Sequence, residues 1–357
     1  MENDPKKILL VDDSALMRRV MSDIINHIDG FTVAYLAADG EEGYAYLSKH
    51  SDIDVVMTDI DMPKMDGLAL IRKAKERGFS SPFIVFSARE DSYAVFTALD
   101  LGAIEFIKKP EHIFQKDVQK YAEKIKKALC MAVEVKERTR NKLETVCIRK
   151  TEKTVITRKQ RKQKHGKKLV ALVCSTGGPR ALQSVIPKLP KNLAAPVVLV
   201  QHMPAGFTKS MAERLNELSQ VQVKEASNGE VLKNGVVYIA PGGTHIAVKK
   251  SGASHVISFN DMPPIGGLKP CANIMFDSLT SSNYDEVVCV VLTGMGADGT
   301  NGILSLGKSK PIYVIAQDEK SSVVYGMPRA IYEAGVVDEV VTLSDVAKAI
   351  TKNVGVK

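Results

Sequence analysis

The sequence has few cysteines, and they do not occur in the patterns in which cysteines act together. Its 357 residues include five, at positions 130, 147, 174, 271 and 289, with no C-x-x-C spacing. A scattered, odd-numbered set argues against a disulfide framework or a zinc site and favours a reducing compartment. We therefore expect a cytoplasmic protein.

Long hydrophobic runs are also absent. Apolar runs such as residues 287–292 are far shorter than the about 20 residues that a membrane-spanning helix needs. The polar residues 1–7 predict no secretory signal, and no repeat typical of solenoids or propellers occurs. These absences predict a protein that does not insert into membranes.

The composition is that of a soluble globular protein, with 45% hydrophobic and 25% charged residues. The length suits two domains of about 100–200 residues each. The net charge is +8, but residues 136–168 hold 14 Lys and Arg against three acids, which leaves −3 for the rest of the chain. The basic character therefore belongs to one segment, which weakens any inference of a basic nucleic-acid-binding face.

Hydrophobic patterning divides the chain into three parts. Residues 6–130 alternate apolar runs, typical of buried parallel strands, with helical patterns, which predicts a doubly wound domain. Residues 131–168 predict a helical tail that passes into an exposed basic linker. Residues 169–352 return to the same alternation. The fold class expected is α/β, with two doubly wound parallel-sheet domains, the first flavodoxin-like and the second Rossmann-like. The predicted strands are residues 7–11, 32–37, 55–58, 83–87, 104–107, 197–201, 235–240, 287–293 and 312–316, with another beginning at 169.

In the first domain, polar and charged residues, three of them acidic, lie at the carboxyl ends of the predicted strands. Asp12 and Asp13 end the first strand, Asp59 follows the third, Ser87 ends the fourth and Lys109 follows the fifth. The carboxyl ends of parallel strands meet at one sheet edge, and three carboxylates there favour a hard cation such as Mg²⁺. The set suits formation of an aspartyl phosphate, although each residue alone could be a turn or helix cap.

These motifs, VDDS (11–14), TDIDMPKMDG (58–67), FSA (86–88) and IKKP (107–110), resemble the receiver domain of two-component response regulators. The resemblance implies that Asp59 is the phosphoacceptor and that Mg²⁺ is the cofactor for its phosphorylation. It further implies metal ligation by Asp12, Asp13, Asp59 and the backbone carbonyl of Asp61, and switch roles for Ser87, Phe106 and Lys109.

In the second domain, Ser175 follows an apolar strand and precedes Gly177 and Gly178. A serine there is exposed at the sheet edge, where backbone N–H groups at a helix start can stabilise an oxyanion. Alternatively, such a glycine-rich turn binds phosphate or only reverses the chain, and the segment is not the G-x-S-x-G motif of other hydrolases.

A general base and an acid to orient it are also available. His202 directly follows a strand and is favoured as the base over His245, for which a structural role is the better interpretation. Asp298, in a glycine-rich loop, is the candidate third member. On chemistry alone, Asp277 and Asp318 remain open.

The motifs CSTGGP (174–179), QHMP (201–204), APGG (240–243) and LTGMGADG (292–299) resemble the catalytic domain of the CheB family of chemotaxis methylesterases, over about residues 168–352. The resemblance implies that Ser175 is the nucleophile, His202 the base and Asp298 the orienting acid. It also places Thr176 and Met295 near the active centre, with the Met295 N–H facing the oxyanion.

The two resemblances together imply a phosphorylation-activated esterase. Its substrates would be glutamyl methyl esters, and glutamines, of methyl-accepting chemotaxis proteins, and its phosphoryl donor a chemotaxis histidine kinase. The esterase would need no cofactor, and we expect a monomer that binds no nucleic acid. The alternatives are a catalytically weak response regulator that binds receptors, one that binds nucleic acid through the basic linker, and a dinucleotide-binding domain, although G-x-G-x-x-G is absent.

Overall fold

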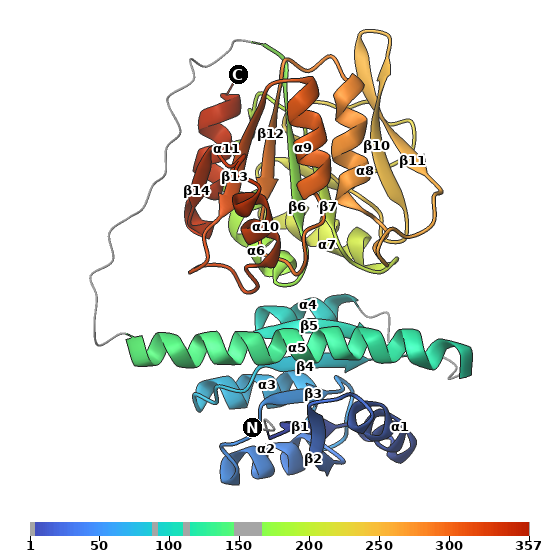
Figure 1. Ribbon diagram of the computed structural model, residues 1–357, viewed down its shortest axis with the longest axis vertical. Coiled ribbons are helices and arrows are strands. Elements are labelled where there is room, and N and C mark those ends of the chain that lie inside the picture. Colours follow the sequence, from blue (N-terminus) through green and yellow to red (C-terminus); the bar gives the residue numbers. More distant parts are fainter. Residues whose placement is uncertain (1–3, 88–91, 110–114, 146–165, 357) are drawn as a thin grey trace. The chain divides into compact units, whose positions relative to one another are not determined.

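The computed structural model describes residues 4–87, 92–109, 115–145 and 166–356, and the chain divides into two compact units. Each unit has its own parallel β-sheet with helices packed against it (Figure 1). Among the helices described, none combines the length and the apolar character needed to cross a membrane.

The first unit contains a five-stranded parallel sheet in the order β2-β1-β3-β4-β5. This order confirms the predicted flavodoxin-like arrangement. The strands β3 and β4 are buried at every position, which explains their uninterrupted apolar sequences. The strands are β1 (Lys6–Val11), β2 (Phe31–Ala37), β3 (Val55–Thr58), β4 (Phe83–Ser87) and β5 (Ala103–Lys108).

Side-chain caps fix where three helices of this unit begin. Ser14, Asp39 and Asp66 each accept a hydrogen bond from a backbone N–H of the first turn that follows. The caps therefore end the loops that leave the carboxyl edge of the sheet. The helices are α1 (Ala15–Asn26), α2 (Gly40–Lys49), α3 (Gly67–Glu76), α4 (Ser92–Asp100) and α5 (Gln115–Thr145).

Helix α5 extends well beyond residue 130, where we expected the first domain to end. Met131 and Ala132 are buried, and Lys136 Nζ donates to the Ile53 carbonyl (2.7 Å) and to Asp54 (3.1 Å). This part of the helix therefore packs on the first unit. The sequence predicted a helical tail here, but the frequent charges of its exposed positions hid its packing on the first unit. Residues 146–165 of the predicted linker lie outside the described residues.

The second unit contains a seven-stranded sheet in the order β14-β13-β12-β6-β7-β9-β8, and every strand pair is parallel. This confirms the predicted Rossmann-like α/β class. The strands are β6 (Lys168–Cys174), β7 (Val197–Gln201), β8 (Gln222–Glu225), β9 (Val236–Ile239), β12 (Glu286–Val291), β13 (Ile312–Gln317) and β14 (Glu339–Val341). The helices are α6 (Gly178–Val185), α7 (Phe207–Leu218), α8 (Ala272–Ser278), α9 (Thr300–Ser309), α10 (Gly326–Glu333) and α11 (Val346–Val354), with 3-10 turns η1 (Ile186–Lys188), η2 (Leu279–Ser281) and η3 (Leu343–Asp345).

An antiparallel hairpin, β10 (His245–Ser251) with β11 (Ser254–Asn260), was not predicted. Its inward residues Ile246, Val248 and Ile257 join the same buried cluster as Met275 and Phe276 of α8. The hairpin therefore belongs to the core of the second unit. It also directs the chain into α8, which lies beside the loops described below.

The strand order of the second sheet reverses between β6 and β12. From β6 the chain adds β7 on one side, whereas β12, β13 and β14 follow on the other side. In open α/β sheets, ligands bind at the carboxyl ends of the strands at such a reversal point. Ser175 follows β6, and the loop that contains Asp298 follows β12. The predicted catalytic residues therefore lie at the reversal point of the sheet.

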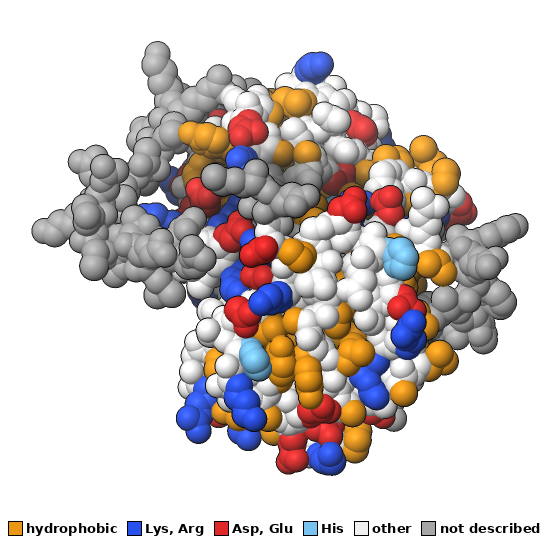
Figure 2. Space-filling model, turned by 60° about the horizontal axis from the view of Figure 1, so that its bottom comes forward, with side chains coloured by type: hydrophobic (Ala, Val, Ile, Leu, Met, Phe, Trp, Pro, Cys, Tyr) orange, Lys and Arg blue, Asp and Glu red, His pale blue; other side chains and the backbone are white. Residues whose placement is uncertain are grey.

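On the face drawn in Figure 2, the described Lys and Arg side chains lie interspersed with Asp and Glu. This agrees with the charge count, in which the positive excess is concentrated in the basic segment.

Candidate active site

The first unit brings its three predicted acidic residues together at the carboxyl edge of the sheet. Carboxylate oxygens of Asp12, Asp13 and Asp59 lie within 4.8 Å of one another. The ammonium of Lys109 is 2.5 Å from Asp12 Oδ2 and 2.5 Å from Asp59 Oδ2. Burial raises the pKa of Asp59, and the neighbouring Asp12 acts in the same direction, while Lys109 opposes them. The cluster is thus an acidic pocket in which the Lys109 ammonium contacts two of the three carboxylates.

This pocket fits a divalent metal ion. Asp12 is fully buried, and its Oδ2 has the ion pair with Lys109 but no hydrogen bond within the described part of the chain. A buried carboxylate with two more carboxylates in reach is suited to a hard oxygen-binding cation. Asp61 lies on the exposed loop that follows β3.

The predicted switch residues lie on the two neighbouring strands. The Ser87 side chain is buried at the end of β4, and the Ser87 carbonyl accepts the N–H of Lys109 (2.8 Å). Phe106 is half-buried on β5. A backbone hydrogen bond therefore joins Ser87 to Lys109, and Lys109 contacts the acidic residues of the pocket.

In the second unit, His202 and Asp298 form a buried pair. His202 Nε2 is 2.8 Å from Asp298 Oδ2, and the two side chains are 8% and 5% exposed. Burial acts to raise the pKa of Asp298, but hydrogen bonds from His202 and from the Ala272 N–H outweigh it and lower this pKa to about 2. Neither Asp277 nor Asp318 occupies this place.

The charge of Asp298 determines the tautomer of His202. An ionised carboxylate only accepts hydrogen bonds, so Nε2 must carry the proton. In the neutral imidazole, Nδ1 then has the free electron pair and can accept a proton. The arrangement suits a general base that acts through Nδ1.

Ser175 is held by its backbone. Its N–H donates to the Thr293 carbonyl (3.0 Å), and its carbonyl accepts from Gly178 N–H (2.7 Å) and from Gln201 Nε2 (3.0 Å). Gln201 Nε2 also donates to the carbonyl of His202 (3.1 Å). One amide therefore ties the two loops together. Among the described residues, Ser175 Oγ makes no hydrogen bond with the imidazole, a contact that free enzymes often form only with substrate.

The loop that contains Met295 packs directly on the serine. A Cβ atom on Gly294 would lie 2.8 Å from the Cβ of Ser175, and one on Gly326 would lie 2.8 Å from the Gly294 carbonyl. Met295 itself is 44% exposed. Thr176 is buried, and its carbonyl accepts the Thr293 hydroxyl (2.9 Å). Thr176 therefore adjoins Ser175 in the chain, and Met295 follows the glycine that packs on it.

His245 has a structural role. It is fully buried, its Nδ1 accepts the N–H of Cys271 (3.1 Å) and its Nε2 faces the Pro263 carbonyl at 3.2 Å. Both ring nitrogens are therefore engaged, which agrees with the structural interpretation from the sequence.

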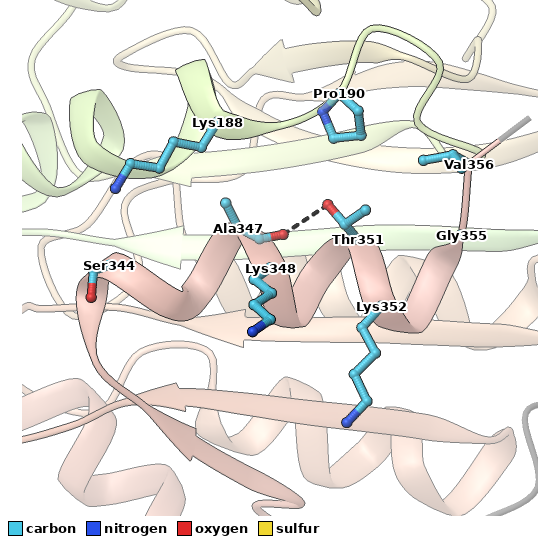
Figure 3. Close-up of a pocket in the computed structure, with 9 residues that line it drawn as sticks. All are labelled: Lys188, Pro190, Ser344, Ala347, Lys348, Thr351, Lys352, Gly355 and Val356. Atoms are coloured by element: carbon cyan, nitrogen blue, oxygen red, sulfur yellow. Dashed lines mark hydrogen bonds between the residues drawn. The ribbon is translucent and has the colours of Figure 1, made fainter.

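A groove elsewhere on the second unit runs along α11 (Figure 3). Its lining comes from η1 and the turn that follows it, from η3, from α11 and from residues 355–356, and it includes Lys188, Lys348 and Lys352. None of the three predicted catalytic residues lines it, so the groove is not the hydrolytic site.

Comparison with known proteins decides the family. The model for CheB methylesterase matches residues 170–350, and the model for the response regulator receiver domain matches residues 8–117. The protein-glutamate methylesterase/protein-glutamine glutaminase of Bacillus subtilis (strain 168) is 40% identical over 351 residues, which cover 97% of this chain and 97% of that one. The chain belongs to the CheB methylesterase family. Both resemblances seen in the sequence are thereby confirmed.

Other CheB relatives match over the same extent. The protein of the same name from Oceanobacillus iheyensis is 37% identical over 350 residues, 97% of this chain and 98% of that one. The crystal structure of the Thermotoga maritima CheB methylesterase catalytic domain is 40% identical, covers 52% of this chain and 98% of that domain, and superposes with a TM-score of 0.50.

Three residues of this CheB-family chain contribute to the site without having been predicted. In the sequence, Gln201 belongs to the QHMP motif, Cys271 is one of five scattered cysteines, and no pattern marks Asn273. Cys271 and Asn273 contact Asp298 through bonds that span 27 and 25 residues. No local pattern in the sequence indicates such contacts.

Proposed function

We propose that this chain is a protein-glutamate methylesterase that hydrolyses glutamyl methyl esters of methyl-accepting chemotaxis proteins and deamidates glutamines of the same receptors. The names of its relatives supply the reacting groups, glutamate methyl esters and glutamines of proteins, and the chemotaxis receptors are what the resemblance to the CheB family implies. The observation that carries the proposal is the buried His202–Asp298 pair at the sheet edge where Ser175 lies. The reaction is the hydrolysis of a carboxylic ester.

The ester reaction proceeds in two halves. Ser175 Oγ attacks the ester carbonyl carbon while its proton moves to His202 Nδ1. Backbone N–H groups beside the serine, with that of Met295 in the Gly294–Gly296 loop, stabilise the oxyanion. The intermediate expels methanol, which takes the proton from the imidazolium, and leaves a glutamyl ester on Ser175. Water, deprotonated by His202, then releases the glutamate carboxylate and restores the serine.

Asp298 contributes by charge and by orientation. It holds the proton on Nε2 and stabilises the imidazolium that forms when Nδ1 accepts the serine proton. A glutamine amide passes through an equivalent tetrahedral intermediate, and it releases ammonia in place of methanol. The same three side chains therefore serve both reactions.

The first unit supplies control by phosphorylation. Asp59 Oδ attacks the phosphoryl group carried by a chemotaxis histidine kinase and becomes an aspartyl phosphate. Asp12, Asp13, Asp59 and the Asp61 carbonyl would hold Mg²⁺, which neutralises phosphoryl charge when bound. Lys109 pairs with the phosphoryl oxygens, and Ser87 and Phe106 respond to them. The protein acts in the cytoplasm on chemoreceptors, with the histidine kinase as its phosphoryl donor. It does so as a monomer.

The esterase is tested by incubating the protein with a chemoreceptor fragment methylated on its glutamates. We expect methanol to be released, with one free glutamate carboxylate for each methanol, and ammonia to be released from a fragment that carries glutamine at the same positions. Methanol is measured enzymatically, and the receptor sites by mass spectrometry. Loss of methyl groups no faster than in buffer would refute the activity.

Replacing Asp59 with asparagine is expected to abolish phosphorylation by a small-molecule phosphodonor, because the amide nitrogen cannot serve as the nucleophile. Chelating divalent metal is expected to have the same effect on the wild-type protein while sparing its unstimulated esterase activity. Phosphate-affinity electrophoresis measures the phosphorylation. Asp66→Asn, which changes an acid that caps α3, is the control. Phosphate incorporation by the Asp59 variant at the wild-type level would contradict the assignment.

A further inference from the structure

The start of helix α8 surrounds the carboxylate of Asp298 with donors. The Ala272 N–H donates to Oδ2 (2.6 Å), which also faces His202. The other oxygen, Oδ1, accepts the Cys271 thiol (3.1 Å), the Asn273 N–H (3.2 Å) and the N–H of Gly299 (2.9 Å). With both oxygens bonded on several sides, the carboxylate cannot rotate without losing bonds to buried donors.

The Asn273 side chain ties α8 to the loop that contains Asp298. Its Oδ1 accepts the N–H groups of Gly299 (3.1 Å) and Gly302 (2.8 Å), at the start of α9. Gly299, the residue before α9, has no side chain that could cap this helix. Asn273 therefore provides the missing cap from a neighbouring helix.

The Cys271 backbone is fixed from the other side. Its N–H donates to Nδ1 of the buried His245 on β10. The thiol is 1% exposed, and burial, with Asp298 acting in the same direction, raises its pKa to about 11. The thiol therefore keeps its proton and remains a hydrogen-bond donor to Asp298 at neutral pH.

We propose that Cys271 and Asn273 are positioning residues of the esterase, which orient the carboxylate of Asp298 so that Oδ2 faces His202. The inference rests on the proposed function for its effect on rate. Both residues act through Asp298 and the loop that contains it. The Cys271 thiol withdraws charge from Oδ1, and the Asn273 amide sets the distance between α8 and the Asp298 loop.

Donor-deleting and donor-retaining substitutions separate these roles. Cys271→Ala is expected to lower kcat about tenfold and Asn273→Leu about a hundredfold, with KM unchanged, because both act on the base and not on substrate contacts. Cys271→Ser keeps a donor and Asn273→Asp keeps both acceptor contacts, so both are expected to recover most of the rate.

Cys271→Ala and Asn273→Asp leave more negative charge facing His202 and are expected to move the acidic limb of the pH profile to higher pH. The ionisable side chains in contact with Asp298 are His202 and Cys271.

The controls alter matched residues that do not contact Asp298. Cys289→Ala removes a buried thiol whose hydrogen-bond partner is the Val287 carbonyl at 3.9 Å. Asn216→Leu removes a side-chain carbonyl that accepts one backbone N–H, that of Val223 (2.9 Å). Both are expected to lower thermal stability while leaving kcat and the pH profile unchanged. Equal losses of kcat in the controls would reduce the proposed roles to packing.

A measurement without substrate keeps the inference separate from the activity. Nitrogen-15 NMR of the full chain, with labelled histidine, reports the tautomer and the titration of His202. We expect the Nε2–H tautomer in the wild type and a shifted titration in Cys271→Ala and Asn273→Leu, which circular dichroism should show to be folded. An unchanged His202 signal in folded variants would overturn the inference. Absence of methanol release by the wild type would instead overturn the proposed function.

Discussion

Replacing Ser175 with alanine is expected to lower methanol release from methylated receptor by at least about 10⁴-fold, since loss of the catalytic serine in another hydrolase lowers kcat by about 10⁶-fold. The substitution removes the oxygen atom that we propose as the nucleophile. It leaves the site otherwise intact, because the backbone bonds of residue 175 to Thr293, Gly178 and Gln201 do not involve the hydroxyl. Receptor binding should therefore persist.

The measurement compares kcat of the variant with that of Ser184→Ala. Ser184 lies on α6, and its hydroxyl donates to the Arg180 carbonyl (3.3 Å), so the control removes a hydroxyl close by in sequence without touching the site. Wild-type rates are expected for the control. If Ser175→Ala still released methanol at a tenth of the wild-type rate, another nucleophile, or water alone, would have to carry out the reaction.

Replacing Asp298 with asparagine is expected to lower kcat by about 10⁴-fold, as the equivalent change does in serine proteases. The amide has the size of the carboxylate but carries an N–H₂ group into a site made of donors. It faces the Ala272 N–H on one side and the Cys271 thiol and Asn273 N–H on the other. With its NH₂ group toward His202, the amide removes the acceptor that keeps the proton on Nε2, so Nδ1 is no longer held as the base. With its oxygen toward His202, the NH₂ group meets the Cys271 thiol and the Asn273 N–H, and the neutral amide no longer stabilises the imidazolium.

The pH profile distinguishes this cause from general damage. The pKa of Asp298 is about 2, so the carboxylate is ionised throughout the range in which kinetics are measured, and the acidic limb belongs to His202. Without the carboxylate, the imidazolium is less stable, and the limb is expected to move to lower pH. Asp277→Asn, an exposed acid on α8, is the matched control and should leave both rate and limb unchanged. An acidic limb at the wild-type position in Asp298→Asn would contradict the pairing.

The same depressed pKa predicts how Asp298 affects folding stability. The carboxyl has a lower pKa in the folded protein than in the unfolded chain, where it is about 3.9. Its contribution to stability is therefore fully present above about pH 4 and is lost as the pH falls toward 2. The Asn variant lacks this contribution.

Where a segment is apolar and buried on both faces, the sequence was sufficient to predict its structure. The strands at Val55–Thr58, Phe83–Ser87 and Val197–Gln201 have the bounds expected from their apolar runs. Where one face is solvated, it was not sufficient. The hairpin strands β10 and β11 mix exposed lysine and serine with inward apolar residues, and the extension of α5 hides its buried residues among frequent charges.

The candidate catalytic residues follow the same division. Their types and their places after apolar strands are properties of the sequence, because the carboxyl ends of parallel strands meet at one edge. Which nitrogen of His202 faces Asp298, and that Gln201, Cys271 and Asn273 hold the site together, was decided by the tertiary structure. These bonds join residues 25 or more positions apart. The bond from Gln201 depends on how β7 lies beside β6, and the bonds from Cys271 and Asn273 depend on how α8 packs against α9. Local sequence patterns carry no information on that packing.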